Sequence, residues 1–171
     1  MDFHELVRNR ESIRSYDPGR PLDRAVLERI AEAGRLAPSA ANRQPWRFVV
    51  FSSPAALERV RRCYARPWFR DAPHVLAVVG DPRKAWERGD GYNSIETDLT
   101  IAMDHMILAA ESEGVGTCWI AAYDPRELRA ALSLEDPERV FAITPLGYPR
   151  AGFTKKGTKD RRPLSGVLQI V

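Results

Sequence analysis

The chain has 171 residues, of which 44% are apolar and 29% charged; this balance is ordinary for a globular protein and excludes an intrinsically disordered one. The formal net charge of +3 favours small anionic ligands and is too slight to indicate a nucleic-acid partner. No apolar run approaches the roughly 20 residues of a membrane span, the N-terminus does not resemble a signal peptide, and the two cysteines form no disulfide framework. We therefore expect one cytoplasmic domain over residues 1–171.

Helical and extended patterns alternate along the chain, separated by prolines and glycines. Ser53 and Asp124 are each followed by Pro, which is typical of a helix start because the side chain caps the helix and Pro suits its first turn. Apolar residues recur at helical spacing over residues 94–113, which predicts a helix in the core or at a subunit interface. We expect helices at 2–9, 23–37 and 94–113 and from 53 and 124 onward, and strands at 47–51, 75–79, 115–120 and 139–146.

The order of these elements does not form a clean run of strand–helix–strand units. No G-x-G-x-x-G follows a strand, which argues against a Rossmann dinucleotide domain. The continuous apolar run at residues 75–79 is instead the candidate central strand of a smaller sheet. The sequence therefore predicts an α+β architecture in which helices cover a small mixed sheet.

Two guanidiniums and a hydroxyl alternate near the N-terminus, at Arg10, Ser12 and Arg14. If this segment is extended, the three side chains point to one face, because strand side chains have a period of two. Such a face suits a phosphate, since Arg offers paired hydrogen bonds that Lys does not. The alternative is a solvated basic turn, which this segment taken alone favours.

Three later segments carry short polar groups, glycines or cations. The first, Pro38–Trp46, has the sequence PSAANRQPW and is either a helix-terminating loop with a core Trp or a set of groups that suits a polar-edged cofactor. The second, Gly114–Ala122, has the sequence GVGTCWIAA, in which Cys118 is expected to be a buried small hydrophobe. The third, Lys159–Leu164, is an exposed basic tail when considered alone.

Together, in this order, the four segments resemble the motifs of the FMN-dependent nitroreductase family. The resemblance implies a three-layer α-β-α fold with a mostly antiparallel sheet, built as an intertwined homodimer with FMN at the subunit interface. It implies that Asn42, on a loop from the other subunit, lies nearest the redox edge of the flavin. Ala121 departs from the family, which more often has Gly there. The cofactor-binding residues it implies are Arg10, Glu11, Ser12, Arg14, Pro38, Ser39, Ala40, Asn42, Trp119, Ile120, Ala121, Lys159 and Arg161, with Arg162 as an alternative to either of the last two.

The same resemblance implies an NAD(P)H-dependent oxidoreductase that passes hydride through flavin N5 to a nitroaromatic, quinone or similar acceptor by a ping-pong mechanism. No side chain is expected to act as a catalytic nucleophile or acid, because the flavin carries the chemistry. Three alternatives stay open: a flavoprotein with one specialised metabolite substrate, a non-enzymatic flavin carrier or sensor, and a basic α+β binding module without flavin.

The remaining ionisable residues do not suggest another kind of site. Glu96 and Asp98 are two residues apart and do not share a helical face, so we interpret them, with Asp104, as solvated or interface charges. The histidines lack metal-ligand spacing, and His105, on an apolar helix, is expected in the core. We therefore predict no metal site.

Overall fold

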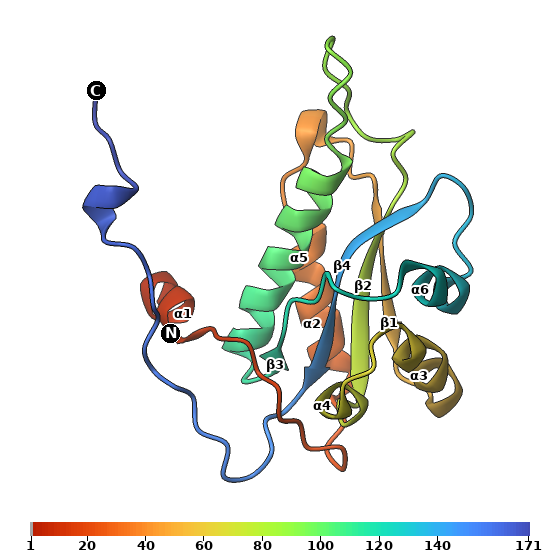
Figure 1. Cartoon of the computed structure of the whole chain (residues 1–171), viewed down its shortest axis with the longest axis vertical. Coiled ribbons are helices and arrows are strands. Elements are labelled where there is room, and N and C mark those ends of the chain that lie inside the picture. Colours follow the sequence, from red (N-terminus) through yellow and green to blue (C-terminus); the bar gives the residue numbers. More distant parts are fainter. Residues whose placement is uncertain (1) are drawn as a thin grey trace.

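The computed structural model describes residues 2–171 and consists of helices packed around one sheet (Figure 1). The helices are α1 Phe3–Asn9, α2 Arg24–Arg35, α3 Pro54–Val60, α4 Pro67–Arg70, α5 Ile95–Ser112 and α6 Pro125–Leu132. The strands are β1 Trp46–Phe51, β2 His74–Gly80, β3 Gly116–Thr117 and β4 Arg139–Gly147. Single 3₁₀ turns lie at Ala40–Asn42, Arg61–Cys63 and Leu164–Gly166.

The four strands pair antiparallel in the order β1-β2-β4-β3. Every residue of β2 is buried, as the continuous apolar run predicted for the central strand. At the β3 edge the chain adds one parallel bridge, between Ser12 and Thr117, in which the Ile13 N–H donates to the Thr117 carbonyl at 2.7 Å. The sheet is therefore mixed and mostly antiparallel, as predicted.

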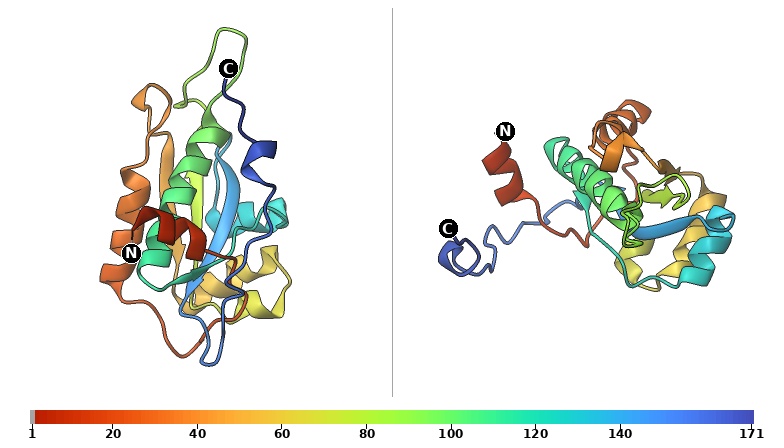
Figure 2. Two further views of the ribbon diagram at one scale, coloured as in Figure 1. Left: turned by 90° about the vertical axis from the view of Figure 1, so that its left-hand side faces the viewer. Right: turned by 90° about the horizontal axis from the view of Figure 1, so that it is seen from above.

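Helices cover both faces of this sheet (Figure 2). Helices α2 and α5 pack on one face, where their apolar residues form a core cluster with those of β2. Helices α3 and α6 pack on the opposite face over a second cluster. The predicted three-layer α-β-α architecture is confirmed. Over residues 2–171, no helix is both long enough and apolar enough to span a bilayer.

Two predicted helix starts are confirmed by hydrogen bonds between the capping side chain and the first turn of its own helix. The Ser53 hydroxyl accepts from the Ala56 N–H at 3.3 Å, and the Asp124 carboxylate accepts from the amides of Arg126 and Glu127. Asp23 occupies the N-cap of α2 but makes no capping hydrogen bond. The sequence signals at Ser53 and Asp124 thus identified both the position of each cap and its hydrogen bond.

Three sequence-based expectations were wrong. The predicted strand 115–120 is interrupted, because only Gly116–Thr117 pairs with β4 before the chain rejoins the sheet through Ile120 and Ile143. His105 is exposed, because the apolar faces of α5 that contact α2 and the sheet do not include it. Asp98 is 1% exposed rather than solvated, because a distant loop covers it.

Helix α1 and the C-terminal segment lie outside these layers (Figures 1 and 2). None of the residues of α1 is buried, and α1 stands beside the C-terminal segment, away from the sheet (Figures 1 and 2). The apolar side chains of the last residues are exposed: Leu164, Val167, Leu168, Ile170 and Val171. We call residues 159–171 the C-terminal arm.

Candidate functional site

The segment from Arg10 to Arg14 is extended, as the alternating pattern required. Ile13 is fully buried against Gly116 of β3, whereas Arg14 is exposed and its guanidinium carbon lies 5.9 Å from the centre of the Trp68 ring. Because neighbouring side chains of an extended segment point to opposite faces, burial of Ile13 directs Ser12 and Arg14 away from the core. The structure therefore supports a shared face for these two groups.

Ser12 and Arg14 border a cavity of about 370 Å³ between the N-terminal segment and the start of the tail. Glu11, another predicted residue, also borders this cavity, and its carboxylate accepts from the Lys156 N–H at 3.0 Å. The remaining lining residues are Ser15, Phe153, Thr154 and Lys156, which the sequence did not identify. We call this space the N-terminal cavity.

The predicted C-terminal cations lie beside the N-terminal segment. Burial lowers the pKa of Lys159, and the neighbouring charges of Arg10 and Arg161 lower it further. The Lys159 ammonium donates to the carbonyl of Val7, in the last turns of α1. Three cations from opposite ends of the chain therefore share one region, an arrangement that an anion would stabilise.

A second lysine, Lys155, which the sequence analysis did not single out, attaches the segment after β4 to α1 and α5. The Lys155 ammonium donates to the Asn9 carbonyl at 3.1 Å and pairs with the carboxylate of Glu111, whose side chain is 8% exposed. A lysine that binds the last carbonyls of a helix also interacts favourably with the negative C-terminal end of the helix dipole. Lys155 and Lys159 thus fix α1, and Arg10 directly after it, against the tail.

The segment after β3 leaves backbone amides for a ligand. The N–H and carbonyl of Ile120 are both bonded to Ile143, at 2.9 and 3.0 Å, and the Ile120 side chain is buried. By contrast, the N–H groups of Trp119 and Ala121 donate to no group within residues 2–171. Trp119 packs edge-on against Phe141 with ring centres 6.2 Å apart. Ile120 therefore attaches this segment to β4, and the amides on either side of it have no hydrogen-bond partner among the described residues.

The Pro38–Trp46 loop has a constrained backbone. Ala41, Asn42 and Gln44 have φ values of 50°, 53° and 49°, a left-handed conformation that costs free energy for residues other than glycine. The Ser39 hydroxyl accepts from the Gln44 N–H at 2.9 Å, and the Asn42 side-chain oxygen accepts from the Gln44 amide at 3.0 Å. Pro38 and Asn42 are exposed, while Ser39 and Ala40 are half-buried. Gln44 therefore braces the loop.

Within one chain this loop lies far from the N-terminal cavity. Ala40 bonds to Asp98 in the first turn of α5, whereas the tail bonds to Glu111 in the last turn. Asp98 and Glu111 are 13 positions apart, which corresponds to about 20 Å along the helix at 1.5 Å per residue. The chain thus brings together the N-terminal segment, the strand end and the C-terminal cations, but not the loop.

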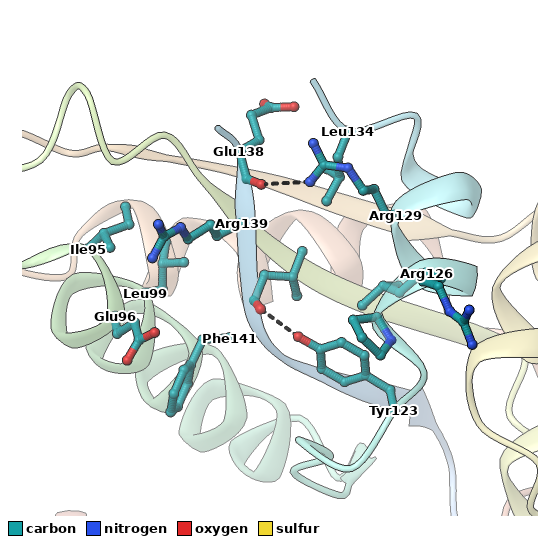
Figure 3. A pocket seen from close by; sticks show the side chains of 13 residues that line it. Ile95, Glu96, Leu99, Tyr123, Arg126, Arg129, Leu134, Glu138, Arg139 and Phe141 are labelled. Carbon is teal, nitrogen blue, oxygen red and sulfur yellow. Dashed lines mark hydrogen bonds between the residues drawn. The ribbon is translucent and has the colours of Figure 1, made fainter. Parts of the chain in front are cut away.

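A further cavity of about 320 Å³, the α5–α6 groove, lies between these helices and the start of β4 (Figure 3). Leu99 and Phe141 contribute apolar surface, and Arg126 and Arg139 add guanidiniums. The Tyr123 hydroxyl, which also borders the groove, donates to the Val140 carbonyl. None of the residues predicted to bind cofactor lines this groove.

Comparison with known proteins agrees with the geometry. A sequence model of the nitroreductase family matches residues 7–63 and 58–148. The chain belongs to the nitroreductase family. It is 28% identical to the NADH dehydrogenase of Thermus thermophilus, with 87% of each chain covered. The protein is therefore an oxidoreductase of this family.

Two solved structures extend the comparison to the fold of this nitroreductase-family chain. A nitroreductase family protein from Clostridium difficile 630 is 31% identical, with a TM-score of 0.90 over 99% of this chain and 98% of that one. A Desulfovibrio desulfuricans protein solved in complex with FMN is 26% identical, with a TM-score of 0.80 over 98% and 95% of the two chains. The resemblance therefore extends over nearly the whole length of both structures.

Proposed function

We propose that the protein is an FMN-dependent oxidoreductase that takes electrons from NADH or NADPH and reduces a nitroaromatic, quinone or similar electron-poor acceptor. One observation carries the proposal. The N-terminal segment, which borders the N-terminal cavity, pairs with β3 through Ser12 and Thr117. Its Arg10 lies beside the C-terminal cations Lys159 and Arg161, so three distant parts of the sequence meet there. We treat residues 1–171 as one cytoplasmic flavin-binding domain.

The cations of this region fit a phosphate. We assign the phosphate to Arg10, Lys159 and Arg161, whose mutual repulsion a dianion relieves. Ser12 and Arg14 border the adjoining cavity and offer a hydroxyl and a guanidinium to the polar chain of the cofactor. Glu11 contributes through the Lys156 amide that it holds.

The segment after β3 fits the flavin ring of the cofactor. The free N–H groups of Trp119 and Ala121 offer donors to the ring, with Ile120 fixing the backbone between them. When bound, FMN supplies the redox chemistry, accepting hydride from NAD(P)H at N5 and returning it to the acceptor in a second half-reaction. The chain itself binds and orients the ring and limits access to it, so no side chain has the role of a catalytic acid, base or nucleophile.

The position of the Pro38–Asn42 loop, which is the first part of the Pro38–Trp46 loop, supports a homodimer. Because this loop lies about 20 Å along α5 from the tail contact at Glu111, we assign it to the flavin site of a second copy related by two-fold symmetry. The exposed apolar side chains of the C-terminal arm also favour a partner that covers them. Each dimer then has two flavin sites, and both subunits contribute to each.

The first test is the visible absorption spectrum of the purified protein, followed by anaerobic addition of NADPH and then NADH. A flavin spectrum that bleaches, with FMN as the released cofactor, supports the proposal. A flavin that neither nucleotide reduces favours a carrier or sensor, and efficient turnover of one metabolite alone favours a specialised enzyme. A colourless protein that FMN does not reconstitute refutes the proposal.

The second test is Arg14→Ala. Loss of a hydrogen bond from a charged group costs about 1.5–3 kcal/mol, so the Kd for FMN should rise roughly 10- to 150-fold. Arg24→Ala is the matched control, because Arg24 is exposed and, within residues 2–171, its side chain pairs only with Glu28 on its own helix. Unchanged FMN affinity in the Arg14 variant, measured by flavin fluorescence, contradicts the assignment of this residue.

A further inference from the structure

Asp98 is a buried carboxylate that joins two segments distant in sequence. It is 1% exposed; Oδ1 accepts from the Ala40 N–H at 2.9 Å and Oδ2 accepts from the Ser94 hydroxyl at 2.8 Å. The Ser94 hydroxyl in turn accepts from the Trp86 N–H at 3.2 Å. Asp98 therefore connects the Pro38–Asn42 loop to the start of α5 and, through Ser94, to Trp86 in the segment before α5.

The loop needs such a connection. Ala41 and Gln44 are not glycines, yet both adopt a left-handed backbone that is unfavourable unless the surroundings hold it. Ala40 directly precedes this strained region, and its N–H donates to a carboxylate 58 residues further along the chain. A charged acceptor makes a stronger hydrogen bond than a neutral one, especially when it is buried.

We infer that Asp98 is a positioning residue that acts on the flavin site of the partner subunit, by holding the Pro38–Asn42 loop in the conformation that completes that site. The inference rests on the proposed function. It assigns Asp98 no contact with the cofactor. Its effect passes through the Ala40 amide to the loop, and so to the second copy of the chain.

The first experiment compares Asp98→Ala with Asp98→Asn. The amide oxygen of Asn can still accept from Ala40, and its NH₂ can donate to the Ser94 hydroxyl, whereas Ala removes both hydrogen bonds. We expect Asp98→Ala to weaken FMN binding by about 10- to 100-fold and to accelerate amide hydrogen exchange at residues 40–44. Asp98→Asn should restore most of the affinity. Asp104→Asn, an exposed acid on the same helix, is the control for loss of charge.

The second experiment asks which subunit Asp98 serves. Heterodimers of an Arg14→Ala subunit and an Asp98→Ala subunit are isolated through two different tags. If Asp98 acts on the partner, one site of each heterodimer contains both substitutions and the other contains neither. We expect each heterodimer to bind one FMN with wild-type affinity, although neither parental homodimer binds FMN tightly.

The outcomes separate the inference from the function on which it rests. Wild-type protein that does not bind FMN refutes the proposed function itself. If the wild type binds FMN and Asp98→Ala binds it equally well, the positioning role is wrong. If the heterodimer has no tight site, Asp98 acts within its own subunit and the inference is overturned. Failure of Asp98→Asn to recover affinity likewise contradicts a role carried by the Ala40 hydrogen bond.

Discussion

The contact between Gly116 and Ile13 attaches the N-terminal segment to the sheet, and its strength can be worked out from the structure. A Cβ atom added at Gly116 would lie 2.9, 3.0 and 3.1 Å from Cγ2, Cβ and Cγ1 of Ile13. These atoms lie near the Ile13 backbone, which its hydrogen bond to Thr117 holds in place, so the side chain has little room to move. Overpacking of this kind costs about 1–3 kcal/mol, which is the loss of unfolding free energy expected for Gly116→Ala.

Ile13→Ala should cost more by itself, about 2–5 kcal/mol, because Ile13 is fully buried. In the double variant the new methyl at position 116 occupies space that Cγ1 and Cγ2 of Ile13 have left. The double variant should therefore lose less unfolding free energy than the sum of the losses in the two single variants. The difference, which is the coupling energy, should be about 0.5–3 kcal/mol. Urea unfolding followed by circular dichroism measures all four corners of this cycle.

The same cycle has a functional readout, because Ile13 lies between Ser12 and Arg14. Gly116→Ala displaces Ile13 and should therefore weaken FMN binding as well as stability. If the losses of unfolding free energy in the two single variants add up to the loss in the double variant within about 0.3–0.5 kcal/mol, the packing argument is refuted. Unchanged FMN affinity in a folded Gly116→Ala protein refutes the link between this contact and the cofactor site.

Three further predictions concern stability and reactivity. Ser53→Ala should lower the unfolding free energy by about 1 kcal/mol, whereas Asp23→Ala, at a cap without a side-chain hydrogen bond, should change it by less than about half of that in the same urea titration. Burial lowers the pKa of His74 below its usual 6.5, and its Nε2 accepts from the Leu22 N–H at 3.0 Å. The unfolded chain therefore binds the proton more readily, so stability should be fully present above pH 6.5 and fall as the pH drops below it; His74→Gln should remove this part of the pH dependence, and an unchanged profile contradicts it. Burial raises the pKa of the Cys63 thiol to about 12, so this thiol should react with a disulfide reagent at pH 8 only after denaturation, and rapid labelling of Cys63 in the native protein counts against its burial.

Short-range chemistry made much of the fold predictable from the sequence. Ser53 and Asp124 each cap a helix through amides two or three residues away, so the signal and its partner lie in the same short segment. The central strand was identified by its continuous apolar run, and β2 is buried at every residue. The order of the four motifs indicated the family, which the family comparison confirms.

Long-range contacts decided the features that the sequence missed. The predicted strand 115–120 is interrupted, because strand length depends on pairing with β4, a segment far along the chain. The sequence did not single out Lys155, and only the fold places it beside Glu111. Asp98 was interpreted as a solvated or interface charge, because the amide from which it accepts a hydrogen bond belongs to residue 40, far away in the sequence.

The sequence by itself thus determined where helices begin, which run forms the central strand, and which residue types are available to hold a phosphate and a flat ring. Only the tertiary structure decided which of these groups meet. It joined the N-terminal segment to the C-terminal cations and to β3, and it placed the Pro38–Trp46 loop at the far end of α5. The physical reason is the range of the forces: capping and periodicity act within a few residues, whereas burial and ion pairing depend on segments that only folding brings together.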